Sequence, residues 1–219
     1  MKKIHNQCDF CNEINNFESS YFKQNFFQHY QKKNLCNRIV FQNEHFFVVP
    51  SAGPISKCHL LICPVEHVTS YATLKPQRLR EATDVLKKFI QLVKKEYGCA
   101  MAFEHGSNID GIGSASCNHA HFHVIAAQIN IEKILEEQGF NLTKISHIND
   151  IYSVVDKNSP YFLIINTENE IWVTKDTICQ SQYLRQLCAK ELNQGNGLWQ
   201  NEIGVEQMIN TNIKLKKYF

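Results

Sequence analysis

The sequence predicts an α+β fold, in which an antiparallel sheet carries one long helix and is followed by a C-terminal α+β extension. Three observations predict it. Short apolar runs bounded by Pro, Gly and polar residues, typical of strands, recur along the chain. Residues 73–97 carry apolar side chains at helical spacing over about seven turns. Of the 219 residues, 43% are hydrophobic and 20% charged, which is an ordinary globular composition.

The first half of the chain supplies the long helix and most of the expected sheet. Residues 38–41 and 45–49 are apolar runs separated by three polar residues, which predicts a hairpin. A strand is expected over 58–63, because its apolar run stops at Pro64. The helix over 73–97 ends at Gly98. In residues 1–36 the apolar residues follow neither helical nor strand spacing regularly.

Two further strands are expected after the helix, at 100–103 and 119–127, on either side of a glycine-rich segment. Beyond residue 130 the same criteria predict elements of both kinds, with helices at 131–138, 181–192 and 204–215 and strands at 152–155, 161–165 and 170–173. We therefore divide the chain into a domain of residues 1–130 and an extension of residues 131–219 packed on it.

The composition excludes several classes of protein. The net charge is +2, from 23 basic and 21 acidic residues, so nothing indicates a nucleic-acid polymer or a membrane surface as partner. No apolar run approaches the roughly 18 residues of a membrane helix, and no signal-peptide-like stretch follows the first residues. Nine cysteines, mostly isolated in apolar segments, are typical of reduced thiols. We expect a soluble, cytoplasmic protein.

Cys8 and Cys11 are the exception among the cysteines. Their Cys-x-x-Cys spacing matches half of a zinc site. A thioredoxin-like redox pair is a second interpretation, although that motif follows a strand and none is expected here. Two incidental thiols are the third.

The most informative feature is a strand on which three histidines, His119, His121 and His123, alternate with small or apolar residues. Residues two apart on a strand share a face, so all three imidazoles are expected to project the same way. Burying three polar rings without partners is costly. Two chemistries fit: the histidines chelate a catalytic metal, or one is a nucleophile that its neighbours orient.

The loop that enters this strand favours the second chemistry. Gly111, Gly113, Ser114 and Ser116 form a small, flexible segment whose backbone N–H groups and hydroxyls can hold a phosphate. A phosphate beside a row of imidazoles indicates attack at phosphorus.

The stretch from His119 to Ile125 resembles the signature of the histidine triad (HIT) superfamily. Residues 53–68 look like the strand of that family that ends in a proline, two residues and a histidine, here Pro64 and His67. The order of the expected elements is also similar. The resemblance covers roughly residues 8–130 and implies a HIT-like catalytic domain.

The resemblance implies a nucleotide hydrolase. His121 would attack the α-phosphorus of a nucleoside 5′-phosphate derivative and form a covalent nucleotidyl-histidine, and His123 would contact the phosphate and the leaving group. Dinucleoside polyphosphates, nucleotide sugars and phosphoramidates are the substrate classes. The resemblance and the loop together suggest a set of phosphate-binding residues: Ser116, Ser114, Gly113, Glu104 and Asn108.

Two alternatives stay open. A nucleotidyltransferase or phosphorylase would use the same intermediate, although the uridylyl-transferring branch carries glutamine at the position of His123. A nucleotide-binding regulatory protein would keep the site with little turnover.

Some HIT proteins carry a zinc ion near the N-terminus, and the resemblance places its ligands at Cys8, Cys11, His67 and His119. Two thiolates and two imidazoles make a closed tetrahedral site, so the zinc would be structural, and the implied mechanism requires no catalytic metal. A metal-dependent hydrolase is the rival, and it predicts that chelation abolishes activity at once.

The extension has two interpretations. Parts of it, around residues 182–187, Trp199 and residues 208–209, loosely resemble longer bacterial-type HIT proteins. It is either a lid or specificity element over the nucleotide site, or a packing element that covers the sheet. The resemblance also suggests a homodimer.

Overall fold

The computed structural model describes residues 8–106, 119–156, 159–175, 182–201 and 203–219. Within these residues, eight strands form one antiparallel sheet in the order β1-β2-β3-β5-β4-β7-β8-β6. The strands are β1 (Phe41–Gln42), β2 (Phe46–Pro50), β3 (His59–Pro64), β4 (Met101–Gly106), β5 (Phe122–Ile125), β6 (Thr143–Ile145), β7 (Tyr161–Ile165) and β8 (Ile171–Lys175). The predicted fold class, α+β with a HIT-like antiparallel sheet, is confirmed.

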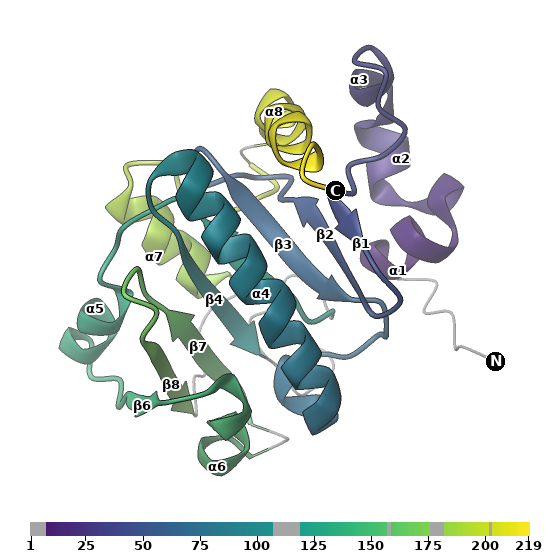
Figure 1. Cartoon of the computed structure of the whole chain (residues 1–219). Coiled ribbons are helices and arrows are strands. Elements are labelled where there is room, and N and C mark those ends of the chain that lie inside the picture. Colours follow the sequence, from purple (N-terminus) through teal and green to yellow (C-terminus); the bar gives the residue numbers. More distant parts are fainter. Residues whose placement is uncertain (1–7, 107–118, 157–158, 176–181, 202) are drawn as a thin grey trace.

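The long helix α4 (Pro76–Tyr97) covers one face of the sheet (Figure 1). It begins with Pro76 in its first turn, where a missing N–H costs nothing, and ends at Gly98, whose φ of 91° suits glycine. Its buried apolar side chains pack against the side chains of β2, β3 and β5 that point to this face, such as Leu60 and Val124. Burying this stripe accounts for the helix far better than intrinsic propensity does.

The opposite face of the sheet carries the polar groups of interest. Strand alternation places His59, Leu61 and Cys63 of β3 on this face, and the register puts Leu61 beside His123 of β5. Three helices pack on this side: α1 (Asp9–Asn15), α5 (Ile131–Glu137) and α7 (Tyr183–Glu191). The histidines therefore lie between the sheet and elements from both ends of the chain.

The strands of residues 131–219 continue the same sheet, because β7 pairs with β4 along five residues. The division at residue 130 thus falls between β5 and α5, inside one continuous sheet. The final helix α8 (Val205–Lys216) lies beside the N-terminal helices α2 (Tyr21–Asn25) and α3 (Phe27–Gln31), where Met208 and Ile209 meet aromatic side chains.

The structure corrects two expectations. Residues 152–155 were expected to form a strand, but Ile151–Val154 form the short helix α6. The buried apolar residues in and beside this helix, Ile148, Ile151 and Val155, are three and four apart, which is helical spacing. The strand expected over 119–127 is shorter, because β5 covers only Phe122–Ile125 and His119 and His121 lie just before it. Residues 9–31, where the sequence showed no period, contain three helices of five to seven residues.

The free edges of the sheet are β1 and β6, of two and three residues. Such short strands offer little backbone for pairing with a second chain. A homodimer stays a prediction, and the sheet edges are not its expected interface. Among the described residues, no helix has the length and apolar character needed to cross a membrane.

Candidate functional site

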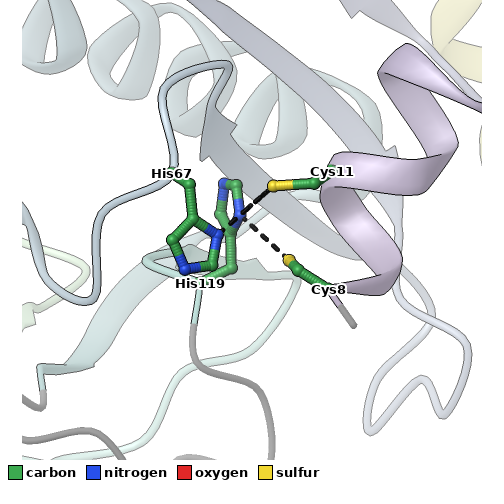
Figure 2. A group of neighbouring side chains, drawn as sticks. All are labelled: Cys8, Cys11, His67 and His119. Carbon is green, nitrogen blue, oxygen red and sulfur yellow. Dashed lines mark hydrogen bonds between the residues drawn. The ribbon is translucent and has the colours of Figure 1, made fainter. Parts of the chain in front are cut away.

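Four side chains that could hold a metal ion meet at the edge of the histidine-bearing face (Figure 2). Cys8 and Cys11 lie at the start of α1, His67 follows β3, and His119 precedes β5. Their ligand atoms all lie within 4.8 Å of one another. The structure thus brings together the four residues proposed as metal ligands from the sequence.

The distances between these ligand atoms fit a tetrahedral ion. Cys8 Sγ lies 3.3 Å from His119 Nδ1, and Cys11 Sγ lies 3.2 Å from His67 Nδ1 and 3.6 Å from His119 Nδ1. Zinc bonds of ordinary length at tetrahedral angles imply S···N separations of roughly 3.5 Å. His119 Nε2 donates to the carbonyl of Pro64 at 2.8 Å, which leaves Nδ1 as the ligand atom.

Helix α1, which begins next to Cys8 and contains Cys11, is held in place by a buried ion pair. Arg38 donates to both carboxylate oxygens of Glu13, at 2.8 and 2.7 Å, and also to the carbonyl of Pro50 at 2.9 Å. Phe10 of the same helix contacts the rings of His119 and His121, with centroids 5.5 and 5.6 Å apart. Through these contacts, α1 supports the histidine segment directly.

One ring nitrogen of His121 is hydrogen-bonded, and the part of the chain that the structure describes offers no partner to the other. Its Nδ1–H donates to the carbonyl of His119 at 2.7 Å, so the lone pair lies on Nε2. Burial is the main cause that lowers the pKa of His121 to about 4, and the charges of His119 and Arg185 lower it further, against the effect of the backbone hydrogen bond. A neutral imidazole with its lone pair on Nε2 is a nucleophilic form.

The third histidine of the motif is oriented by a fourth, His59 of β3. The backbone N–H of Ile55 donates to His59 Nδ1 at 3.3 Å, so the proton of neutral His59 lies on Nε2. His59 Nε2–H then donates to His123 Nδ1 at 2.8 Å, which places the proton of His123 on Nε2. Phe103 stacks on the His123 ring at 4.5 Å.

Burial keeps both members of this pair uncharged. It is the first cause that holds the pKa of His59 and of His123 well below the usual range, and the charge of Arg185 acts in the same direction on both. His105, on the same face of β4 as Phe103, also has its pKa lowered to about 4, by burial and then by the charge of His121. The cluster therefore presents neutral imidazoles near neutral pH.

The expected phosphate-binding residues divide into two groups. Asn108, Gly113, Ser114 and Ser116 lie outside the described residues. The structure places the fifth, Glu104, on the face of β4 opposite to His105, where its carboxylate accepts from Tyr71 N at 2.9 Å and from the hydroxyl of Tyr161. Because Glu104 is only 1% exposed and its carboxylate is bonded to these partners, we interpret it as a structural group of the core. It has no role in the proposed mechanism.

The placement of Glu104 predicts a pH-dependent stability. Burial raises the pKa of Glu104 from 4.5 to about 7, against the effect of its two hydrogen bonds. A raised pKa means that its stabilising contribution is complete below about pH 4.5 and is lost as the pH rises through about 7. The loss is at most about 3 kcal/mol. Urea unfolding of wild type and Glu104→Gln, at about pH 5 and about pH 8, measures it.

We expect Glu104→Gln to lose this part of the pH dependence and the exposed control Glu66→Gln to keep it. The explanation is wrong if the difference between wild type and Glu104→Gln is the same at both pH values.

Three residues in or near the histidine cluster are not among the site residues predicted from the sequence. His59 lies in an apolar strand, and the available signal was that a buried imidazole needs a partner. Arg185 of α7 gave no signal, because an arginine on an amphipathic helix is usually solvated. His105, for which the sequence left both a loop position and a substrate role open, belongs to β4.

The alternating histidines on a HIT-like sheet define a histidine triad protein. A sequence model of the family described as "Scavenger mRNA decapping enzyme C-term binding" matches residues 24–139, more than half of the 219-residue chain. The chain belongs to this family, and with it to the HIT superfamily.

Several solved structures are similar to parts of this one. A DUF4931 family protein from Bacillus cereus has a TM-score of 0.45 and 16% identity, over 83% of this chain and 99% of that one. A hypothetical histidine triad nucleotide-binding protein from Sulfolobus tokodaii has a TM-score of 0.37 and 21% identity, over 54% and 67%. Yeast Ap4A phosphorylase in complex with AMP has a TM-score of 0.41 and 13% identity, over 62% and 57%.

Proposed function

We propose that this protein is a nucleotide-processing enzyme, a hydrolase that cleaves at the α-phosphate of a nucleoside 5′-phosphate derivative through a covalent nucleotidyl-histidine. The observation that carries the proposal is the complementary protonation of His121 and His123. His121 offers a lone pair on Nε2, because its Nδ1–H is held by the His119 carbonyl. His123 offers a proton on Nε2, because His59 occupies its Nδ1. Membership of the HIT superfamily supports the same assignment.

In the first step, His121 Nε2 attacks the α-phosphorus and the bond from phosphorus to the leaving group breaks. His123 Nε2–H donates a hydrogen bond to the leaving atom and keeps its proton; the leaving group departs with the bonding electron pair, and an amine leaving group takes its proton from solvent. Two such displacements are easier than one, because each has a well-placed nucleophile and leaving group.

In the second step, water attacks the phosphorus of the nucleotidyl-histidine. The P–N bond breaks and its electron pair returns to His121 Nε2, the nucleoside monophosphate leaves, and the water gives up one proton to solvent. An acceptor such as inorganic phosphate in place of water would make the same chemistry a phosphorylase or transferase reaction.

We also propose that Cys8, Cys11, His67 and His119 hold a structural zinc ion. The ligand-atom distances and the orientation of His119 support this assignment. When bound, the ion would fix α1 against the segment that carries His121 and would take no part in the chemistry. His119, as a ligand, is then unavailable to the substrate.

The test of the reaction class is product analysis in ¹⁸O-labelled water, with a dinucleoside polyphosphate, a nucleotide sugar and a nucleoside phosphoramidate as substrates. A hydrolase acting at the α-phosphorus releases nucleoside monophosphate that carries one ¹⁸O. If added phosphate suppresses this label and nucleoside diphosphate forms instead, the protein is a phosphorylase. Binding of all three substrates without any product favours the nucleotide-binding regulatory protein.

A further inference from the structure

A basic surface is formed by the second half of α4, the end of α8 and the residues that follow α8 (Figure 1). Helix α4 covers the face of the sheet opposite to the histidines, so its exposed side chains point away from the proposed reaction site. We call this surface the α4–α8 patch. Its lysines are Lys87, Lys88, Lys94, Lys95, Lys214, Lys216 and Lys217, of which Lys214 is half-buried and the others are exposed.

The positive charge of the chain is concentrated on this patch. Residues 87–97 and 213–219 hold seven lysines and one acidic residue, Glu96, so their net charge is +6. The whole chain carries +2, which means that all other residues together carry −4. The small overall charge thus conceals a local positive surface, and such a surface attracts a polyanion.

Glu96 fastens the two parts of the patch together. Its carboxylate lies 3.4 Å from Lys214 Nζ and 3.6 Å from Lys217 Nζ, and it accepts from the hydroxyl of Tyr218. The next acidic residue on the exposed face of α4 is Asp84, one turn before Lys87. One carboxylate cannot balance seven lysines, so the patch stays strongly positive.

Two partly exposed aromatic rings lie among the lysines. Phe219 is 46% exposed and Tyr218 is 37% exposed. The Phe219 ring stacks on buried Phe89 of α4, with centroids 5.3 Å apart and an angle of 20° between the rings. Lys88 Nζ lies 4.2 Å from the centre of the Phe219 ring, and Lys95 Nζ lies 5.0 Å from that of Tyr218. The patch therefore places aromatic rings and cations side by side.

The position of these rings favours nucleic acid over a membrane as the partner. A membrane-binding surface projects apolar side chains into the headgroup region. Here Phe219 lies against Phe89 and also contacts Phe41, at 5.0 Å between centroids, and Tyr218 is bonded to Glu96. Rings held on a positive surface are typical of proteins that bind single strands, because bases stack on the rings and phosphates contact the cations.

We propose that the α4–α8 patch binds single-stranded nucleic acid without sequence preference, separately from the proposed reaction site. The bases stack on Tyr218 and Phe219, and the flexible lysines beside the rings turn to the phosphates. The inference does not rest on the proposed function, because the histidines lie on the other face of the sheet. It revises the expectation, drawn from the net charge, that no nucleic-acid polymer is a partner.

The test is fluorescence anisotropy of the full chain with labelled oligouridylate and oligothymidylate of about ten nucleotides, without terminal phosphates, between about 50 and 200 mM salt. Contact with about four phosphates should make log Kd rise with the logarithm of the salt concentration at a slope of about 3. The double variant Lys88→Gln/Lys95→Gln should bind at least about 10-fold more weakly at the lowest salt, with a slope smaller by about 1.4. Tyr218→Ala should bind at least about 5-fold more weakly, whereas Tyr218→Phe, which keeps the ring, should bind as wild type does.

The matched control for charge is Lys133→Gln/Lys144→Gln, which removes two exposed lysines of α5 and β6, outside the patch. This control and His121→Ala should both keep the wild-type affinity and slope. The strand that wild type binds more tightly identifies RNA or DNA as the preferred partner.

Three results would overturn the inference. The first is that wild type binds neither oligonucleotide, including the case in which it binds vesicles of equal parts phosphatidylcholine and phosphatidylserine instead, which would make the patch a membrane surface. The second is equal weakening in the two double lysine variants, because binding would then depend on net charge alone. The third is a loss of binding in His121→Ala, which would place the oligonucleotide at the histidines.

Discussion

Replacing His121 with alanine is expected to lower kcat by about 10⁴-fold or more on any nucleotide substrate that the wild type turns over, because the reaction loses its nucleophile. The measurement is the rate of nucleoside monophosphate release under single-turnover conditions. The fold should survive, since with the described residues His121 makes one hydrogen bond, to a backbone carbonyl, and ring contacts with Phe10 and His123.

Two further proteins sharpen this prediction. His29→Ala changes an exposed histidine of α3 and should leave kcat unchanged. His121→Gly leaves space for free imidazole, which should restore part of the activity by acting as the nucleophile. Undiminished turnover in both His121 variants would contradict the mechanism.

Removing the metal ligands is expected to have the largest effect on stability. We expect one zinc ion per chain in the purified protein, measured by elemental mass spectrometry. Cys11→Ser should lose the ion and lower the Tm by roughly 10 °C, because metal binding stabilises only the folded chain. The hydrogen bond with Cys8, and after it burial, raises the pKa of Cys11 in the metal-free protein. Two adjacent thiolates there therefore need a cation between them.

The control for this experiment is Cys36→Ser, because Cys36 is an exposed thiol outside the cluster. It should keep both the zinc and the Tm.

Chelation of the wild-type protein is a separate test. If the ion is structural, activity after chelation should fall only as the protein unfolds, with the same time course. Loss of activity well before any unfolding would instead indicate a metal that takes part in catalysis.

Much of the sheet could be predicted because proline and glycine mark its elements. Pro64 ends β3, and Gly98 ends α4. Helix α6 was not predicted, because the apolar spacing within its four residues does not distinguish a strand from a helical turn. The short N-terminal helices were missed for the same reason.

The candidate site was only partly predictable, because its residues lie far apart in the sequence. Cys11 and His67 are 56 residues apart, and resemblance to known proteins suggested the pair. His59 and His123 are 64 residues apart, and their hydrogen bond depends on the register of β3 and β5, which no local pattern specifies. Arg185 reaches Ser51 across 134 residues.

The most direct test of the proposed mechanism is covalent labelling with an α-³²P-labelled nucleotide substrate. The protein is quenched under alkaline conditions, which preserve a phosphorus–nitrogen bond, and then digested and mapped. The mechanism predicts acid-labile label, up to one per chain, on the peptide that contains His121 in wild type, and none in His121→Ala. Product formation by wild type without such label, or equal label in the variant, would contradict it.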